Sequence, residues 1–351
     1  FSITRIAPDH FYLVSAIGSE LKDLHWMQQH TDGYEVEVKN VTEEIGAILV
    51  TGPKSREILQ HMTEDDLSHA AFPWLTAQAI TLEHGKPITQ ARLEVIRGAE
   101  FFEWDAGEAM RTYGRVIPAA RGHKFSVHHQ PIGVVAAFSP WNFPMSQPAR
   151  KIAGALASGC SIILKAAEET PAGAIHIARA FEDAGLPAGV FNLVFGDPAQ
   201  ISGYLIPQES VRLVAFTGST VVGCHLSTLA SQNMTSTLME LGGHAPVIVC
   251  EDTDVKTAAT AGAVRKMRNA GQVCTSPTRF FVNEAIFDEF TQAFVARAKQ
   301  TVVGNGMETG IEMGPLANDR RVPALTALVE DARAKGATVA TGGARLGDTG
   351  Y

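Results

Sequence analysis

The fold of this chain is decided by residues 131–171, which read PIGVVAAFSPWNFPMSQPARKIAGALASGCSIILKAAEETP. Two apolar runs, at residues 132–137 and 161–164, flank a segment with helical spacing at 147–157. A strand, a helix and a second strand in this order are typical of a parallel crossover unit. The stretch therefore predicts an α/β fold built on a mostly parallel sheet.

The same alternation continues toward the carboxyl end of the chain. Further strands are predicted at residues 190–194, 213–216 and 246–249, and further helices at 171–183 and 220–230, the first of them opened by the helix-start signal Thr170-Pro171. In an open parallel sheet the turns after the strands meet at one edge, where ligands bind. The turns expected at this edge are 139–142, 165–168, 196–197 and 218–219.

The residues before about position 80 have a different pattern. Short strands are predicted at 11–14 and 45–50, followed by the turn Thr51-Gly52-Pro53 and a helix at 54–62. This is α+β material, and a long helical stretch from about residue 77 to 113 is expected to connect it to the α/β part.

Composition restricts the classes of function. A chain of 351 residues with 45% hydrophobic and 19% charged residues is typical of a globular protein. A net charge of −8 without a basic run argues against nucleic acid and anionic membranes as partners, and no apolar stretch is long enough to cross a bilayer. Four widely spaced cysteines predict reduced thiols in the cytoplasm. No metal-binding motif is present, so no metal site is expected. The chain begins without methionine, and we expect it to start within a longer protein.

Cys274 is the candidate nucleophile. It follows the small and polar residues Arg268-Asn269-Ala270-Gly271-Gln272-Val273, which would leave its sulfur approachable. Cys250, at the end of an apolar run, has instead the setting of a cysteine kept for packing. For Cys274 taken alone, a free and half-buried thiol remains the alternative.

Two other residues could serve a nucleophile. Glu240 ends a strand-like segment before the paired glycines Gly242 and Gly243, where a carboxylate could act as a general base. Asn142 follows the first strand of the α/β part, and its amide could donate a hydrogen bond to an oxyanion. Taken singly, Glu240 could equally be a surface glutamate, and Asn142 part of a rigid aromatic turn.

Cofactor contacts are predicted at the same edge. Lys165 and Glu168 could bind a ribose diol, and Gly218 and Ser219 open a helix whose amino end suits a pyrophosphate. Solvated loop charges are the alternative for the first pair, and the second lacks the spacing of the GxGxxG fingerprint.

Five motifs in order resemble the NAD(P)-dependent aldehyde dehydrogenase superfamily over residues 81–351. They are Trp141-Asn142-Phe143-Pro144, Leu164-Lys165-x-x-Glu168-x-Thr170-Pro171, Phe216-Thr217-Gly218-Ser219-Thr220, Glu240-Leu241-Gly242-Gly243 and Asn269-x-Gly271-Gln272-x-Cys274. The resemblance implies a Rossmann-type NAD-binding domain at 79–241 and a catalytic domain at 242–351, which stops before the family's later Glu-x-Phe-Gly-Pro segment. A homo-oligomer of the parent protein is implied as well.

The resemblance also implies roles for individual residues. Cys274 would add to an aldehyde, Asn142 with the backbone N–H of Cys274 would hold the oxyanion, and Glu240 would activate the hydrolytic water. NAD is favoured over NADP, because the carboxylate of Glu168 would repel a 2′-phosphate. The implied cofactor contacts are Ser139, Pro140, Trp141, Lys165, Glu168, Gly196, Gly218, Ser219, Val222 and Gly242.

Arg150 and Arg268 resemble the carboxylate-binding arginines of succinate-semialdehyde dehydrogenases, which implies a small aldehyde that carries a carboxylate. The alternative for both is a structural ion pair. Ser276 stands where some members of that branch carry a second cysteine, so no redox disulfide is expected there.

Residues 1–78 resemble a fragment of the aminomethyltransferase-like region of dimethylglycine and sarcosine dehydrogenases. The resemblance rests on Phe11-Tyr12-Leu13-Val14-Ser15, Gly52-Pro53-Lys54-Ser55-Arg56 and the segment at 66–74. Two alternatives to aldehyde oxidation therefore stay open: a nucleotide-binding fragment without turnover, and a folate-linked fusion module.

Overall fold

The structure is a computed structural model that describes residues 2–7, 10–14, 24–25, 27–29, 37–38, 75–347 and 350. The chain divides into two compact units, Phe1–Ala71 and Phe72–Tyr351. In the first unit, strand β1 (Ser2–Ala7) pairs antiparallel with β2 (His10–Val14), which includes the strand predicted at 11–14. The strand predicted at 45–50, the turn at 51–53 and the helix at 54–62 lie outside the described residues.

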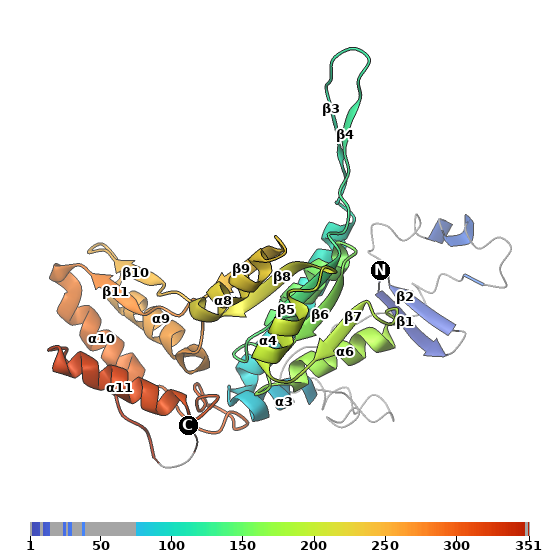
Figure 1. The fold of residues 1–351 in the computed structure, drawn as a ribbon. Coiled ribbons are helices and arrows are strands. Elements are labelled where there is room, and N and C mark those ends of the chain that lie inside the picture. Colours follow the sequence, from blue (N-terminus) through green and yellow to red (C-terminus); the bar gives the residue numbers. More distant parts are fainter. Residues whose placement is uncertain are drawn as a thin grey trace. The chain divides into compact units, whose positions relative to one another are not determined.

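The second unit is built on a parallel sheet, as predicted (Figure 1). Its five strands are hydrogen-bonded in the order β7-β6-β5-β8-β9. Because the chain runs outward from β5 to β7 and then returns to the other side of β5, the strand order reverses between β5 and β8, which is where open sheets bind ligands. The strands are β5 (Val134–Phe138), β6 (Ser161–Lys165), β7 (Phe191–Val194), β8 (Val211–Gly218) and β9 (Ser236–Leu241).

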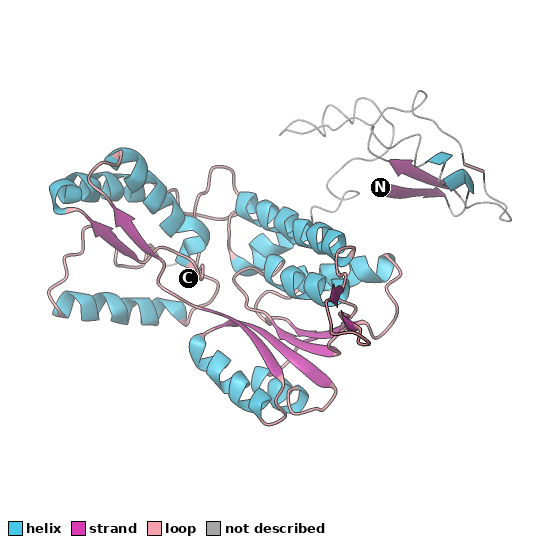
Figure 2. Cartoon of the chain, turned by 90° about the horizontal axis from the view of Figure 1, so that it is seen from above, coloured by secondary structure: helices cyan, strands magenta, loops and turns pink. Residues whose placement is uncertain are grey.

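Helices cover both faces of this sheet (Figure 2). Alternate residues of β5 point to opposite faces, so Val135 and Ala137 join a core with Ile152 of α5, whereas Ala136 and Phe138 join one with Leu226 of α8. The helices between the strands are α5 (Ser146–Ala157), α6 (Ala172–Asp183), α7 (Pro198–Leu205) and α8 (Thr220–Ser231). The near-continuous apolar strands are typical of a parallel sheet buried on both faces.

The long helical stretch predicted from about residue 77 to 113 forms as two helices, α3 (Leu75–His84) and α4 (Ile88–Ala109), and ends before residue 113. Gly85 adopts a left-handed φ of 88° and ends α3. Pro87 then precedes the first residue of α4, where its missing N–H costs no hydrogen bond. The break places Lys86 between the two helices, and this position matters for the site.

The strand predicted at 246–249 forms, but it does not belong to the main sheet. Strand β10 (Pro246–Val249) pairs in parallel with β11 (Arg279–Val282), and Phe280 of β11 packs with Val249 and Phe290. The helices of this part are α9 (Val255–Met267), α10 (Phe287–Lys299) and α11 (Arg321–Ala334), with short 3-10 turns η2 (Arg268–Gly271) and η3 (Glu284–Ile286). Cys250 follows β10 directly and is exposed, so the prediction that it serves packing is wrong; Cys160 is the buried cysteine.

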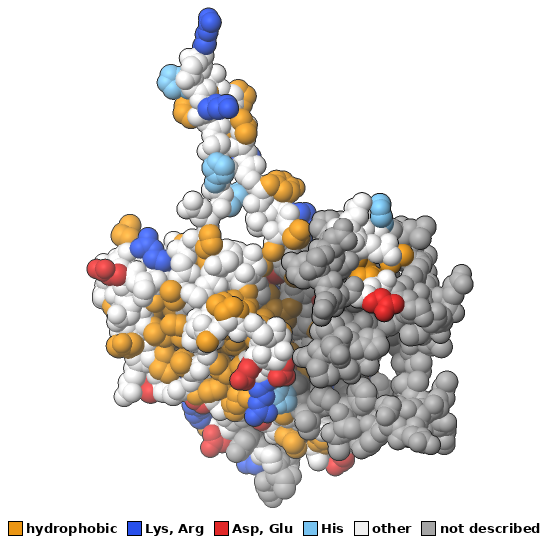
Figure 3. All heavy atoms as spheres, turned by 90° about the vertical axis from the view of Figure 1, so that its right-hand side faces the viewer, with side chains coloured by type: hydrophobic (Ala, Val, Ile, Leu, Met, Phe, Trp, Pro, Cys, Tyr) orange, Lys and Arg blue, Asp and Glu red, His pale blue; other side chains and the backbone are white. Residues whose placement is uncertain are grey.

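A hairpin of β3 (Arg115–Ile117) and β4 (Phe125–Val127) follows α4. It projects from the body of the unit and carries basic, histidine and hydrophobic side chains (Figure 3). Val116 is 83% exposed and Phe125 is 55% exposed. Among the described residues, no helix combines the length and the apolarity needed to span a membrane.

Candidate active site

The carboxyl edge of the sheet carries most of the residues predicted to bind a cofactor. Ser139 continues β5, and its backbone N–H donates to the carbonyl oxygen of Lys165 at the end of β6 (3.1 Å). Gly218 ends β8, and Ser219 caps α8 by accepting from the N–H of Val222 (3.4 Å). The amino end of α8 therefore faces the edge where the strand order reverses, with unpaired N–H groups that suit an anion.

Three features of this edge fit a dinucleotide. The hydroxyl of Ser139 is buried and has no hydrogen-bond partner among the described residues, as expected of a group that binds a ligand. Lys165 and Glu168 form an ion pair in which only Glu168 is substantially exposed. Gly242 has no atom within 4 Å of the position of a Cβ, which leaves room beside the end of β9.

The remaining predicted cofactor residues lie close by. The carbonyl oxygen of Trp141 accepts from the hydroxyl of Thr170 (3.3 Å), and the ring of Trp141 lies 5.7 Å from that of His84. Pro140 lies between Ser139 and Trp141 in this turn, and Gly196 follows β7 with a φ of 135° that favours glycine.

Asn142 joins the turn after β5 to the segment that contains Cys274. Its side-chain Nδ2 donates to the carbonyl oxygen of Gln272 (2.9 Å). Its own carbonyl oxygen accepts from Lys86 Nζ (2.8 Å) and from Asn269 Nδ2 (3.1 Å). The structure thus joins Asn142 to Gln272, which lies two residues before Cys274 and 130 positions after Asn142 in the sequence.

The buried ion pair between Lys86 and Glu94 stabilises the turn that contains Asn142. Lys86 Nζ lies 2.5 Å from Glu94 Oε2, and the two side chains are 1% and 3% exposed. The other oxygen of Glu94 accepts from the backbone N–H groups of Met145 (2.8 Å) and Ser146 (3.2 Å), which stabilises the start of α5. Burial lowers the pKa of Lys86 from its ordinary value, and the charge of Glu94 opposes this shift.

The backbone before Cys274 is strained. Asn269 and Ala270 have positive φ values of 53° and 54°, and Gly271 follows at 73°. Such non-glycine conformations cost about 1–3 kcal/mol each and are frequent at functional sites. Hydrogen bonds hold the strained segment: Gln90 accepts from Asn269 N (3.0 Å), and Gln272 donates to Asn269 O (3.1 Å). Cys274 follows this segment and is exposed.

Glu240 is surrounded by positive and hydroxyl groups. Its Oε1 pairs with Arg150 Nη1 (3.2 Å), and its Oε2 accepts from Thr217 Oγ1 (2.8 Å) and lies 3.8 Å from Lys151 Nζ. Burial raises the pKa of Glu240, but the Thr217 hydrogen bond and the charges of Lys151 and Arg150 outweigh it, so the pKa is lowered. Burial lowers the pKa of Lys151 to about 8, with Arg150 adding to the shift and Glu240 opposing it.

The two arginines predicted to bind a substrate carboxylate occupy different settings. Arg150 pairs with Glu240, and its guanidinium lies over the ring of Phe101 at 4.7 Å. Arg268 is exposed and lies over the ring of Phe143 at 5.5 Å. Phe143 adjoins Asn142, so Arg268 is near the predicted oxyanion donor.

Several residues of the site were not predicted from the sequence. Lys86, Glu94 and Gln90 come from the helical segment before the hairpin, and Lys151 and Thr217 adjoin residues that were predicted. The pattern contained a usable signal for Lys151, since it lies on the buried side of α5 one turn after Gln147. For the others, only the tertiary contacts reveal a role.

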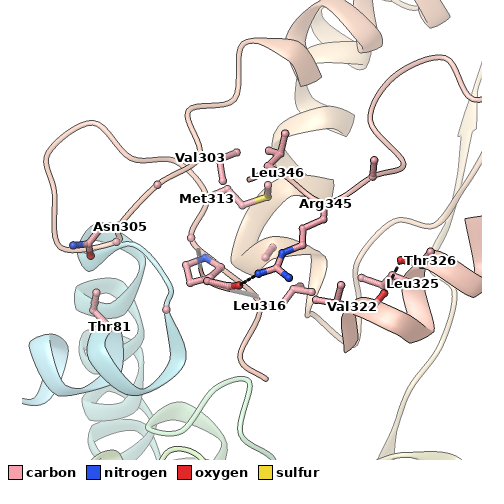
Figure 4. A pocket seen from close by; sticks show the side chains of 18 of the residues that line it. Thr81, Val303, Asn305, Met313, Leu316, Val322, Leu325, Thr326, Arg345 and Leu346 are labelled. Atoms are coloured by element: carbon pink, nitrogen blue, oxygen red, sulfur yellow. Dashed lines mark hydrogen bonds between the residues drawn. The ribbon is translucent and has the colours of Figure 1, made fainter. Parts of the chain in front are cut away.

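An apolar cavity of about 720 Å³ lies apart from these residues (Figure 4). Its walls come from α3, the loop at 303–316, α11, residues 343–346 and Gly350. None of the predicted catalytic residues lines it. Arg345 reaches across it and donates to the carbonyl oxygen of Gly350 (2.8 Å).

Comparison with known proteins decides the family. The model of the aldehyde dehydrogenase family matches residues 72–351. The chain belongs to this family. A second family model, that of the GCVT N-terminal domain, matches residues 1–93, so both predicted resemblances are confirmed.

Named relatives in the aldehyde dehydrogenase family support this assignment. The chain is 47% identical over 262 residues to the 4-(hydroxymethyl)benzenesulfonate dehydrogenase TsaD1 of Comamonas testosteroni, covering 74% of this chain and 55% of the relative. It is 42% identical over 268 residues to a succinate semialdehyde dehydrogenase of Acinetobacter baylyi, covering 76% and 56%. The chain thus spans just over half the length of these relatives.

Solved structures agree with the sequence comparison. The succinate-semialdehyde dehydrogenase of Burkholderia pseudomallei superposes with a TM-score of 0.75 at 42% identity, over 77% of this chain and 56% of that one. The prediction of an aldehyde dehydrogenase-like fold is confirmed.

The buried Lys86–Glu94 pair generates a stability prediction. We expect Glu94→Leu to lower the free energy of unfolding by about 3–5 kcal/mol, because it leaves the Lys86 ammonium buried without its partner. The double variant that combines Lys86→Met with Glu94→Leu should lose less than Glu94→Leu alone, since no buried charge remains. Urea denaturation of Lys86→Met, of Glu94→Leu and of the double variant measures this coupling, and additive losses would contradict it.

His84 generates a prediction about pH. Its ring is buried without a hydrogen-bond partner among the described residues, and burial, with Lys86 adding to the effect, lowers its pKa to about 3. As pH falls from 6.5 toward 3, His84 becomes protonated in the unfolded chain but stays neutral in the folded one. The free energy of unfolding therefore decreases by up to ~1.4 kcal/mol per pH unit over this range.

We expect His84→Phe to remove this part of the acid sensitivity. As pH falls from about 6 to about 4, the free energy of unfolding of the native protein should decrease more than that of the variant. His225→Phe, on an exposed position of α8, is the matched control for loss of an imidazole. Parallel pH profiles for native protein and His84→Phe would refute the expectation.

Proposed function

We propose that the protein containing this chain oxidises a small aldehyde to the acid with NAD as hydride acceptor. The observation that carries the proposal is the hydrogen bond from Asn142 to Gln272, which sets an amide donor beside the segment that presents Cys274. An amide nitrogen carries two hydrogens, and only one is used by Gln272. The other is available to an oxyanion on the carbon that Cys274 attacks.

The first half of the reaction makes a thioester. The Cys274 thiolate adds to the aldehyde carbon, and Asn142 with the backbone N–H of Cys274 stabilises the resulting oxyanion. The carbonyl forms again as hydride leaves that carbon. NAD, when bound at the edge formed by Ser139, Lys165, Glu168 and Ser219, supplies the nicotinamide ring that accepts the hydride.

The second half releases the acid. Glu240 accepts a proton from water as the water oxygen adds to the thioester carbon. The carbon–sulfur bond then breaks, Cys274 leaves as a thiolate, and Glu240 returns the proton to solvent. The lowered pKa of Glu240 keeps it ionised, as a base must be, but also weakens it as a base.

The positive charges of two arginines support a class of substrate. Arg150 and Arg268 place two guanidiniums near the catalytic residues, and guanidinium suits a carboxylate. Relatives named for succinate semialdehyde and glutarate semialdehyde, at 42% and 40% identity, support an aldehyde with a carboxylate at its far end. We therefore propose succinate semialdehyde or a similar aldehyde as substrate.

The proposal extends to location and assembly. Reduced cysteines, with none paired in the structure, support a cytoplasmic enzyme. The exposed apolar side chains of the β3–β4 hairpin support a homo-oligomer of the parent protein.

The mechanism predicts different defects for two variants. Cys274→Ser should abolish NADH formation with succinate semialdehyde. Glu240→Gln should still release about one NADH per subunit in a first burst and then turn over slowly, because the thioester accumulates. Stopped-flow absorbance separates the two phases, and Cys224→Ser, an exposed thiol on α8, is the control. An unchanged rate in Cys274→Ser, or saturable NAD binding without NADH in the native protein, would overturn the proposal.

The preference for NAD rests on Glu168. Replacing its carboxylate in Glu168→Gln should remove repulsion of a 2′-phosphate and free Lys165 to bind it. We expect the ratio of kcat/KM for NADP over NAD to rise about tenfold, which corresponds to ~1.4 kcal/mol. Glu169→Gln is the matched control, since that neighbouring carboxylate pairs with Arg320 instead. A ratio that stays the same in both variants would refute the assignment.

A further inference from the structure

Glu240 is restrained at both of its carboxylate oxygens. Arg150 binds Oε1, while Thr217 and Lys151 face Oε2. A general base must present a free lone pair to water within about 2.6–3.2 Å. Each oxygen keeps a further lone pair, but the arginine on one oxygen and the hydroxyl and ammonium on the other fix the orientation of this carboxylate and lower its pKa, which weakens it as a base.

Arg150 is the partner that can leave. The side chains of Lys151 and Arg150 are 5% and 51% exposed. Lys151 is also fixed by a 2.6 Å hydrogen bond to Thr217, whereas the guanidinium of Arg150 rests on the ring of Phe101. A partly exposed ion pair contributes little to stability, so another carboxylate can compete for this guanidinium.

We propose that Arg150 determines specificity at the hydrolysis step: the far carboxylate of the substrate takes its guanidinium from Glu240 and thereby frees the base. This inference rests on the proposed function and deepens it. An aldehyde without an anionic group would still form the thioester, but it would leave Glu240 bound to Arg150 and would be hydrolysed slowly. Arg150 acts here through Glu240, as a positioning residue for the base.

The bonds made and broken in the hydrolysis step are the same as in the proposed function. Water loses a proton to Glu240 as it adds to the thioester carbon, and the sulfur of Cys274 leaves with the electron pair of the carbon–sulfur bond. The substrate carboxylate only replaces Glu240 as the ion-pair partner of Arg150. Recognition of the correct aldehyde would thus appear in kcat as well as in KM.

The test compares succinate semialdehyde with butanal, which has the same chain length and no carboxylate. In Arg150→Met, kcat/KM for succinate semialdehyde should fall about 30-fold, since a charged partner of the substrate is lost. The steady-state rate with butanal after the NADH burst should rise roughly fivefold, because Glu240 is no longer restrained. Arg111→Met, which breaks an exposed pair with Glu108, is the control for loss of an arginine.

The native protein allows a second measurement that does not depend on how a variant folds. With acetaldehyde as substrate, added acetate should occupy Arg150 and accelerate the phase that follows the burst. The same addition should have no effect on Arg150→Met. Buffered chloride at equal ionic strength controls for screening.

The outcomes separate this inference from the proposed function. Opposite effects of Arg150→Met on the two aldehydes, together with activation by acetate, support it. Equal losses for both aldehydes would assign Arg150 a structural role, and an unchanged butanal rate would make it a substrate contact only; either result overturns the inference. Absence of any NADH formation by the native protein with either aldehyde would instead contradict the proposed function.

Discussion

The hydrogen bond from Asn142 to the carbonyl oxygen of Gln272 joins two parts of the chain that fold around different sheets. Asn142 belongs to the turn after β5, and Gln272 precedes Cys274 in the segment between α9 and β11. The left-handed residues Asn269 and Ala270 make this contact possible, because they turn the backbone back toward the sheet edge. Their strain persists because the side chain of Gln90 from α4 and the backbone carbonyl oxygen of Asn142 hold Asn269 in place.

Charge burial is the second constraint on the site. Lys86 and Glu94 are almost completely buried, and each uses its remaining hydrogen-bonding capacity on the backbone of the turn or of α5. A pair of this kind contributes little net stability, but removing one member is costly, so it fixes a unique arrangement. Glu240 lies in a less buried cluster, where Arg150 remains free enough to exchange partners. The Lys86–Glu94 pair is thus fixed, whereas the ion pair between Arg150 and Glu240 can exchange partners.

Much of the fold was predictable, and the errors have physical causes. The apolar runs of β5, β6 and β8 are nearly continuous because helices bury both faces of the sheet, which makes them visible in the sequence. The helical stretch predicted from about residue 77 to 113 is divided at Gly85 and Pro87, which end one helix and begin the next. Cys250 looked like a packing residue because it follows an apolar run, but β10 lies in a two-stranded sheet and ends just before it.

By itself, the sequence determined the parallel α/β core, its family and the identity of Cys274, Glu240 and Asn142 as candidates, because apolar periodicity and local motifs are written in adjacent residues. The tertiary structure alone decided the partners of these residues. Lys86 reaches Asn142 across 56 positions, and Arg150 reaches Glu240 across 90. Such contacts depend on the direction of side chains across elements that pack only in the folded state. For that reason the sequence could name Glu240 as a candidate base, but only the structure shows its ion pair with Arg150.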